Sequence, residues 1–252
     1  MTTIKTTDVT TIAPLAHREA MRLQATELDR ALAMLRTLEA DQWATQTNCP
    51  DWDVRQMWLH VLGACEAGAS TRENMHQMRA ARKRRSKLGV ALEAGLSGVQ
   101  VAERDDLSTH ELLQRLEAIA PKTVKGRSRT PRPMRAIRIA IDAPVVEKWT
   151  LGYLIDVIYL RDAWMHRVDT ASATGAELVL TADHDGRIVA DVVAEWARRH
   201  GQPFTLELTG PAGGGFTARN GGEPMVVDAV EFCSLLAGRG EPTGLFTTIV
   251  PF

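Results

Sequence analysis

The chain has 252 residues, enough for one large domain or two smaller ones with proper cores. Hydrophobic residues make up 44% and charged residues 24% of it, which are the fractions of an ordinary soluble globular protein. A formal net charge of -1 argues against a protein dedicated to nucleic acid or to acidic membranes.

The N-terminal part of the chain is predicted to be mostly helical. Leucines at positions 28, 32 and 35 follow helical spacing and predict a helix over Pro14–Leu38. Asp53 with Gln56, and Ser108 with Glu111, form capping boxes that predict the starts of two more helices, and Pro121 is expected to stop the second of them. Further helices are predicted over Met75–Lys87, Val90–Glu103 and Trp149–Val168, with an extended loop over Pro121–Pro144. Long antiparallel helices of this kind favour a bundle.

The pattern changes near Gly175, where short strands begin to alternate with helices. Strands are predicted at Glu177–Leu180, Phe204–Thr209 and Leu245–Val250, and helices at Asp185–His200 and after Asp228. The expected fold class is therefore α+β, with a helical bundle over residues 12–172 and a smaller α/β domain over residues 173–252.

Cysteine usage and the absence of targeting segments indicate the compartment. The three cysteines are widely spaced and form no C-x-x-C pair, which fits a reducing environment. Met1–Ala13 lacks the apolar core of a signal peptide, and no run approaches the roughly 20 apolar residues that span a bilayer. We therefore expect a cytoplasmic protein with no membrane partner.

Asp162 and His166 are the most informative residues of the chain. Leu151, Ile155 and Ile158 mark the inward face of the predicted helix, and steps of four residues from Ile158 reach Asp162 and then His166. A carboxylate that faces a protein interior is costly unless it is paired or bound to a metal.

A metal site and a plain polar contact both explain this pair. A catalytic zinc takes three protein ligands, and His60, which has apolar neighbours, is the best third candidate. In the alternative, Arg161 or Arg167 neutralises Asp162. Asp169 also lies on the inward face, near the end of the helix. Its role could be that of a fourth ligand, of a hydrogen-bond acceptor for a ligand, or of a helix cap.

Two basic stretches, residues 79–87 and 122–138, make nucleic-acid binding a further hypothesis. They lack the interleaved aromatic residues that stack on bases, so nucleic acid is not an expected partner, and a solvated helix face and a charged loop are the simpler interpretation.

Three segments together resemble one known family. These are Cys49-Pro50-Asp51-Trp52-Asp53-Val54-Arg55 followed by His60, then Arg161-Asp162-Ala163-Trp164-Met165-His166-Arg167-Val168-Asp169, and the ending from Val230-Glu231-Phe232 through Ala237-Gly238-Arg239 to Val250-Pro251-Phe252. The chain is similar in them to the mycothiol-dependent maleylpyruvate isomerase-like proteins of the DinB-like superfamily. It departs from their pattern at Asp51, where glycine is more usual, and at Asp162, where the best-known isomerase pattern has glutamate.

The resemblance implies a DinB-like four-helix bundle with a divalent metal, usually zinc, held by His60, Asp162 and His166. It implies that mycothiol, a low-molecular-weight thiol, is the cosubstrate, and that Arg239 is a catalytic residue that holds a substrate carboxylate. A plain helix C-terminal charge is the alternative for Arg239.

The expected function is that of a metal-dependent transferase or isomerase that uses mycothiol on an unassigned small-molecule substrate. The alternative is a non-catalytic metal-binding, ligand-binding or sensor protein that keeps the bundle. A homodimer stays open.

Overall fold

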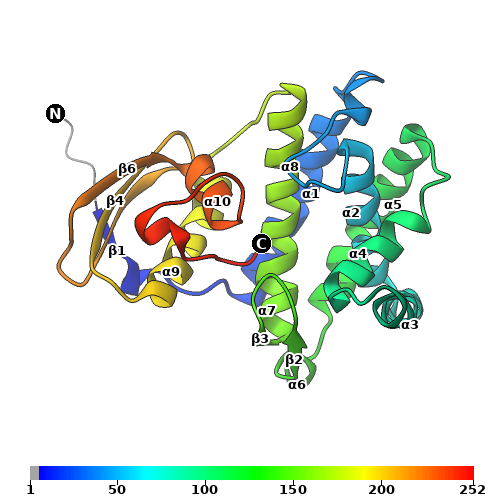
Figure 1. Ribbon diagram of the computed structural model, residues 1–252, viewed down its shortest axis with the longest axis horizontal. Coiled ribbons are helices and arrows are strands. Elements are labelled where there is room, and N and C mark those ends of the chain that lie inside the picture. The colour runs from blue at the N-terminus through cyan, green and yellow to red at the C-terminus, as the bar shows by residue number, and fades with distance from the viewer. Residues whose placement is uncertain (1–5) are drawn as a thin grey trace. The chain divides into compact units, whose positions relative to one another are not determined.

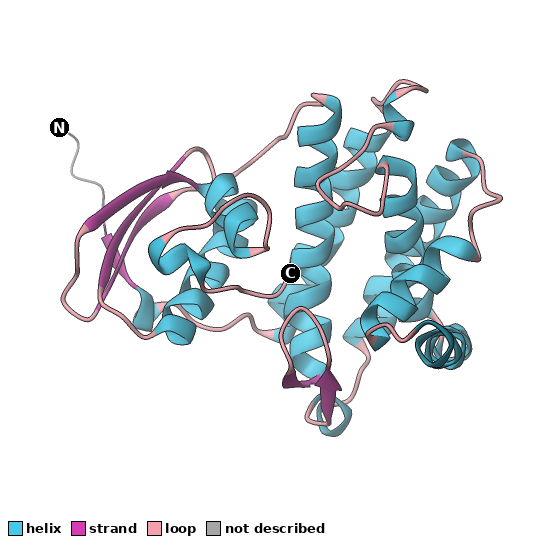
Figure 2. Cartoon of the chain, viewed as in Figure 1, coloured by secondary structure: helices cyan, strands magenta, loops and turns pink. Residues whose placement is uncertain are grey.

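The computed structural model describes residues 6–252, so the expectation for Met1–Ala13 falls in part outside the described residues. Contacts divide the chain into two compact units, one over Ala16–Leu178 and one that combines the segment ending at Leu15 with Val179–Phe252. The fold is α+β, as predicted, with a larger helical unit and a smaller α/β unit (Figures 1 and 2).

Four long helices, α1, α2, α5 and α8, form the bundle of the larger unit. The helices of this unit are α1 (His17–Leu35), α2 (Val54–Ala69), α3 (Thr71–Leu88), α4 (Leu92–Ala102), α5 (Thr109–Ser128), α6 (Arg132–Arg135), α7 (Leu151–Tyr153) and α8 (Tyr159–Thr174). Helix α5 packs on α1 and α2, and α8 closes the bundle against the same two helices. Its core includes Leu35, Trp58, Leu62 and Leu116, all nearly or fully buried.

The predicted capping boxes are confirmed, and they fix where two bundle helices begin. The Asp53 carboxylate accepts from the backbone N–H of Gln56, and the Gln56 side chain accepts from the backbone N–H of Asp53. Ser108 and Glu111 make the same exchange at the start of α5. Each box satisfies backbone donors that a helix start otherwise leaves open.

The expectation that Pro121 stops its helix is wrong, because α5 continues for two turns to Ser128. A proline inside a helix removes one backbone hydrogen bond. Here the turns after it are held by packing: Thr123 is fully buried, and its hydroxyl donates to the Cys65 carbonyl on α2 at 2.6 Å. The predicted loop over Pro121–Pro144 is therefore wrong over most of its length.

After α5, the chain folds into α6 and a short hairpin before the last bundle helix. Strands β2 (Arg138–Ile141) and β3 (Glu147–Thr150) pair antiparallel. The predicted long helix after Trp149 is confirmed, but residues Leu154–Ile158 form a π-helical segment between α7 and α8. Such segments insert an extra residue per turn and recur near functional sites.

In the part of the chain that the structure describes, the smaller unit is a four-stranded mixed sheet with two α-helices. Its elements are β1 (Thr6–Asp8), α9 (Arg187–His200), β4 (Phe204–Thr209), β5 (Gly214–Ala218), β6 (Pro224–Asp228) and α10 (Ala229–Leu236). The strand order is β1-β5-β4-β6, in which only β5 and β4 run antiparallel. Trp196 on α9 packs on Phe204, Phe232 and Phe246 and centres the core of this unit.

Two predicted strands of the smaller unit are wrong. Glu177–Leu180 forms no strand within the described residues 6–252, and none of its side chains is buried. The segment predicted as a final strand begins as a short 3₁₀ helix, Gly244–Thr247, and then follows α10, where the Val250 N–H donates to the Leu236 carbonyl at 3.1 Å.

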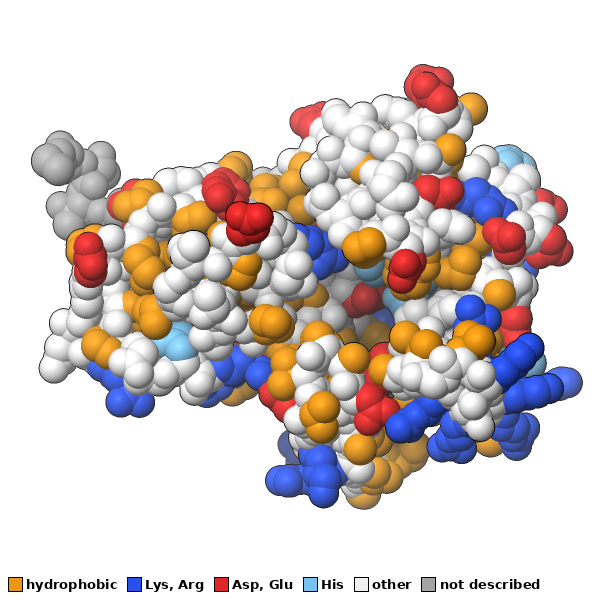
Figure 3. Space-filling model, viewed as in Figure 1, with side chains coloured by type: hydrophobic (Ala, Val, Ile, Leu, Met, Phe, Trp, Pro, Cys, Tyr) orange, Lys and Arg blue, Asp and Glu red, His pale blue; other side chains and the backbone are white. Residues whose placement is uncertain are grey.

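The two basic stretches lie on different elements of the fold. Lysine and arginine side chains gather over α3, which carries the first stretch (Figure 3). The second stretch is divided among α5, α6 and β2. In it Arg127 is buried, and Arg135 forms an ion pair with Asp156 at 3.0 Å.

Within residues 6–252, no helix is both long and apolar enough to cross a membrane. All three cysteines are free thiols. A cytoplasmic location stays a prediction.

Candidate metal centre

His60 and the pair Asp162 and His166 come together between α2 and α8. His60 lies on α2, two turns after the Asp53 cap, and its flanking residues Leu59 and Val61 are buried. Asp162 and His166 lie one turn apart on α8. The side chain of His60 is 13% exposed, that of Asp162 25% and that of His166 7%, so the cluster sits at the edge of the bundle core.

The distances within the cluster suit a divalent metal. Asp162 Oδ1 lies 3.3 Å from His166 Nε2 and 3.7 Å from His60 Nε2. The three ligand atoms all lie within 4.8 Å of one another. Two ligand atoms, each about 2.0–2.1 Å from a tetrahedral zinc, are about 3.3 Å apart.

The hydrogen-bonding state of the histidines also fits a metal. Both ring nitrogens of His166 and Nδ1 of His60 are buried without a hydrogen bond of good geometry. Buried polar atoms are seldom left in this state unless a water or an ion satisfies them. The residues present therefore fit a divalent metal held by three protein ligands, the number that is usual for a catalytic zinc.

The two charged members of the cluster shift each other's pKa. Burial lowers the pKa of His166, but the Asp162 carboxylate beside it raises that pKa well above the usual value, with further support from Asp169 and Cys49. Burial likewise raises the pKa of Asp162, but His166 and His60 together hold it well below its ordinary range. Without a metal, the site is therefore an ionised Asp162 against a protonated His166.

Within residues 6–252, no arginine forms an ion pair with Asp162, so the alternative of Arg161 or Arg167 is wrong. Arg167 is fully buried and pairs with Glu27 on α1, with 2.5 Å between Arg167 Nε and Glu27 Oε1. Among residues 6–252, the ion-pair partners of Asp162 are the two histidines.

Asp169 lies on the opposite side of the His166 ring from Asp162. Its Oδ2 is 3.6 Å from His166 Nδ1 and accepts a hydrogen bond from the Cys49 thiol at 3.8 Å. Asp169 therefore faces Nδ1 of His166 while Asp162 faces Nε2, and its carboxylate, with His166 and Cys49, also lies within reach of a common metal ion.

Trp52, which has no assigned role in the sequence motif, covers the histidines. Its ring stacks on His60 with 5.0 Å between centroids and meets the edge of His166 at 6.4 Å. A second tryptophan ties the two helices together: Trp58 Nε1 donates to Thr170 Oγ1 at 2.9 Å, and that hydroxyl donates to the His166 carbonyl at 2.7 Å. Trp52 occurs inside the Cys49-to-Arg55 motif, so the signal was available in the sequence.

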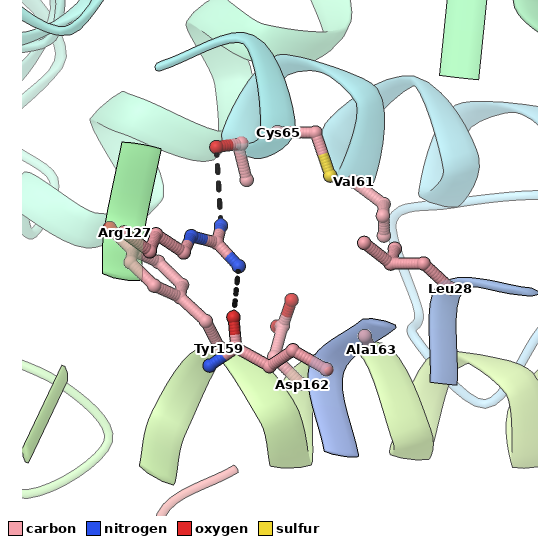
Figure 4. A pocket seen from close by; sticks show the side chains of 9 residues that line it. Leu28, Val61, Cys65, Arg127, Tyr159, Asp162 and Ala163 are labelled. Carbon is pink, nitrogen blue, oxygen red and sulfur yellow. Dashed lines mark hydrogen bonds between the residues drawn. The ribbon is translucent and has the colours of Figure 1, made fainter. Parts of the chain in front are cut away.

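A small cavity of about 10 Å³ adjoins the cluster and is also absent from the sequence predictions. Asp162 and Arg127 both line it, from α8 and α5 (Figure 4). Arg239 lies in the smaller unit, in the turn after α10, and its predicted role stays untested.

Comparison with known proteins shows the family of the chain. Residues 24–171 match the family model described as the mycothiol maleylpyruvate isomerase N-terminal domain. No curated protein matches the chain.

Two solved structures share the fold. They are a crystal structure of the mycothiol-dependent maleylpyruvate isomerase and one of a point mutant of it, 16% and 15% identical to this chain. Each aligns with a TM-score of 0.57 over 93% of this chain and 92% of that one. Because the matched model covers most of the helical unit, including His60, Asp162 and His166, the chain belongs to the mycothiol maleylpyruvate isomerase family.

Proposed function

We propose that this protein is a metal-dependent enzyme that uses mycothiol to transfer or isomerise a small-molecule substrate. The proposal rests on the convergence of three potential ligands: Asp162 Oδ1 lies 3.3 Å from His166 Nε2 and 3.7 Å from His60 Nε2. Ring nitrogens of both histidines are also buried without a hydrogen-bond partner. Membership of a mycothiol-dependent family supplies the thiol.

Each residue of the site has a distinct task in this proposal. His60, Asp162 and His166 hold the divalent metal, for which zinc is the proposed identity because nitrogen and carboxylate ligands at tetrahedral spacing suit it. A bound metal with an open position lowers the pKa of a thiol, which then binds as thiolate and is a nucleophile at neutral pH. Because the thiol comes from mycothiol, no cysteine of the chain has to act as the nucleophile.

The surrounding residues hold the two histidines in place. Asp169, fully buried, orients His166 by facing its Nδ1, and Trp52 stacks on His60 and shields that ring from water.

Arg239 is proposed to bind a substrate carboxylate, because a guanidinium forms two parallel hydrogen bonds with that group.

Metal analysis of the purified protein tests the site. We expect close to one zinc or other divalent ion per chain in the parent, and its loss in His60→Ala and in His166→Ala. His110→Ala is the matched control, because His110 is an exposed histidine on bundle helix α5. A parent chain that stays metal-free after incubation with zinc, yet is folded, contradicts the proposal.

Calorimetry with mycothiol then separates an enzyme from a sensor. We expect mycothiol to bind the metal-loaded protein and to bind the metal-free protein much more weakly. Binding of metal without any binding of mycothiol favours a sensor or other binding protein that keeps the bundle, and it contradicts the thiol-dependent reaction.

A further inference from the structure

Cys49 and Asp169 form a second group of potential metal ligands with His166. The Cys49 side chain is partly buried, and that of Asp169 is fully buried. Cys49 Sγ, one ring nitrogen of His166 and one carboxylate oxygen of Asp169 all lie within 4.8 Å of one another. This group shares only the His166 ring with the candidate metal centre, and Cys49 has no task in the proposed reaction.

The distances within this second group also suit a tetrahedral metal. Asp169 Oδ2 lies 3.8 Å from Cys49 Sγ and 3.6 Å from His166 Nδ1. A sulfur ligand at about 2.3 Å and an oxygen ligand at about 2.1 Å from one tetrahedral ion are about 3.6 Å apart, and a nitrogen and an oxygen ligand are about 3.3 Å apart. Both measured distances are longer than these values by only a few tenths of an ångström.

His166 Nδ1 indicates a ligand at this position independently of the cysteine. The His166 side chain is 7% exposed, and its Nδ1 is buried without a hydrogen bond of good geometry. The Asp169 oxygen that it faces, at 3.6 Å, is too distant for an ordinary hydrogen bond. An ion bound between the nitrogen, the carboxylate and the thiol would satisfy this buried atom.

The loop before α2 holds the backbone of Cys49 in place. Its N–H donates to Thr47 Oγ1 at 3.1 Å, and its carbonyl accepts from the Trp52 N–H at 3.0 Å and from the Gln46 side-chain amide at 2.9 Å. The thiol donates to Asp169 on α8. Because these hydrogen bonds already order the residue, Cys49 loses little further conformational freedom when it binds an ion.

We propose that Cys49, His166 Nδ1 and Asp169 form a second divalent-metal site, which has a softer set of ligands than the first. A thiolate favours zinc and other thiophilic ions over magnesium and calcium, which prefer oxygen ligands. Cysteine binds a metal as thiolate, so the thiol proton passes to the buffer on binding, and no group is oxidised or reduced. This site does not depend on the proposed function.

The two sites are alternatives, because they share one imidazole. A neutral imidazole offers one nitrogen to a metal and keeps its proton on the other. A metal on Nδ1 leaves the proton on Nε2, which faces Asp162 at 3.3 Å, and a metal on Nε2 leaves it on Nδ1, which faces Asp169. Each chain therefore holds one ion, and an ion at Cys49 takes His166 away from the candidate metal centre.

Cobalt titration of His60→Ala, followed by absorption spectroscopy, tests the proposal. A thiolate bound to Co²⁺ gives an intense charge-transfer band in the near ultraviolet, which imidazole and carboxylate ligands do not give. His60→Ala removes a ligand of the first site. Since a thiol proton has to be displaced, we expect the second site to be empty in this variant as purified and to fill when Co²⁺ is added in excess.

The thiolate band should therefore develop in His60→Ala and be lost in His60→Ala/Cys49→Ala. His60→Ala/Cys65→Ala is the matched control, because Cys65 is a free thiol on α2, and it should keep the band. Asp162→Ala removes a different ligand of the first site, so it allows the same measurement if His60→Ala does not fold.

The parent chain separates this proposal from the proposed function. Its first equivalent of Co²⁺ is expected to bind at His60, Asp162 and His166 without the thiolate band. A thiolate band from that first equivalent supports the Cys49 site and contradicts the proposed catalytic centre. Folded His60→Ala that gives no band in excess Co²⁺ overturns the Cys49 site alone, and so does a band that persists without Cys49.

Discussion

Binding of a divalent metal at His60, Asp162 and His166 should release a proton near neutral pH. The pKa of His166 is held well above its usual value of 6.5, because the attraction of Asp162 outweighs the effect of burial. Asp162 is already ionised at neutral pH, because its pKa lies well below the usual value of 3.8. A metal binds only the neutral imidazole, so the proton on His166 has to leave.

The size of the effect follows from linkage. For each pH unit below the raised pKa of His166, the apparent metal affinity should fall tenfold, about 1.4 kcal/mol. Above that pKa the contribution of His166 is constant. Proton release per metal should therefore approach one near neutral pH and decline as pH rises through the pKa of His166.

Isothermal calorimetry in two buffers of different ionisation enthalpy measures the released proton directly. Asp162→Asn has almost the same shape but lacks the charge that raises the pKa of His166, so we expect weaker metal binding and less proton release. His110→Ala should behave as the parent. A binding enthalpy of the parent that is the same in both buffers near neutral pH refutes the reasoning, because His166 would then be neutral before the metal binds.

Two further predictions concern the framework that positions the site. Asp53→Ala removes the cap of α2 and should lower the free energy of unfolding by about 1 kcal/mol in urea denaturation, whereas Asp51→Ala, an exposed neighbour, should be near neutral. An equal loss in both variants would show that the cap does not matter. Gly126→Ala should destabilise by about 1–3 kcal/mol, because its Cβ would collide with the backbone carbonyl of Gly68 where α5 crosses α2. Gly98→Ala meets only a flexible arginine side chain and is the matched control; a Gly126→Ala variant as stable as the parent would contradict the close approach.

Much of the fold could be predicted from local patterns. Apolar residues at helical spacing predicted the bundle helices, and Asp53, Ser108 and Asp228 predicted where three helices begin, because a cap is made by residues within one turn of each other. The stripe through Asp162 and His166 likewise placed both side chains on one face of one helix.

The predictions from the sequence were wrong where contacts between residues far apart in the chain determine the local structure. Pro121 is unfavourable inside a helix by local rules, but α5 continues because Thr123 and Arg127 pack against α2. Since Leu112, Leu116 and Ala120 already mark the buried face, continuing that spacing past the proline would have placed Arg127 inside. In the sequence, Arg127 is one of many basic residues in the stretch 122–138, and its burial was therefore not predicted.

The sequence by itself determined which residues have the chemistry of a metal site, and that His166 follows Asp162 on one face of a helix. Only the tertiary structure decided that His60, about a hundred positions away, meets them at ligand distances. It also decided that Arg167 pairs with Glu27, whereas Arg127 is buried with no carboxylate of residues 6–252 within 4.0 Å of it. The physical reason is that the spacing of side chains along a helix is local, whereas the pairing of buried charges depends on which helices pack together.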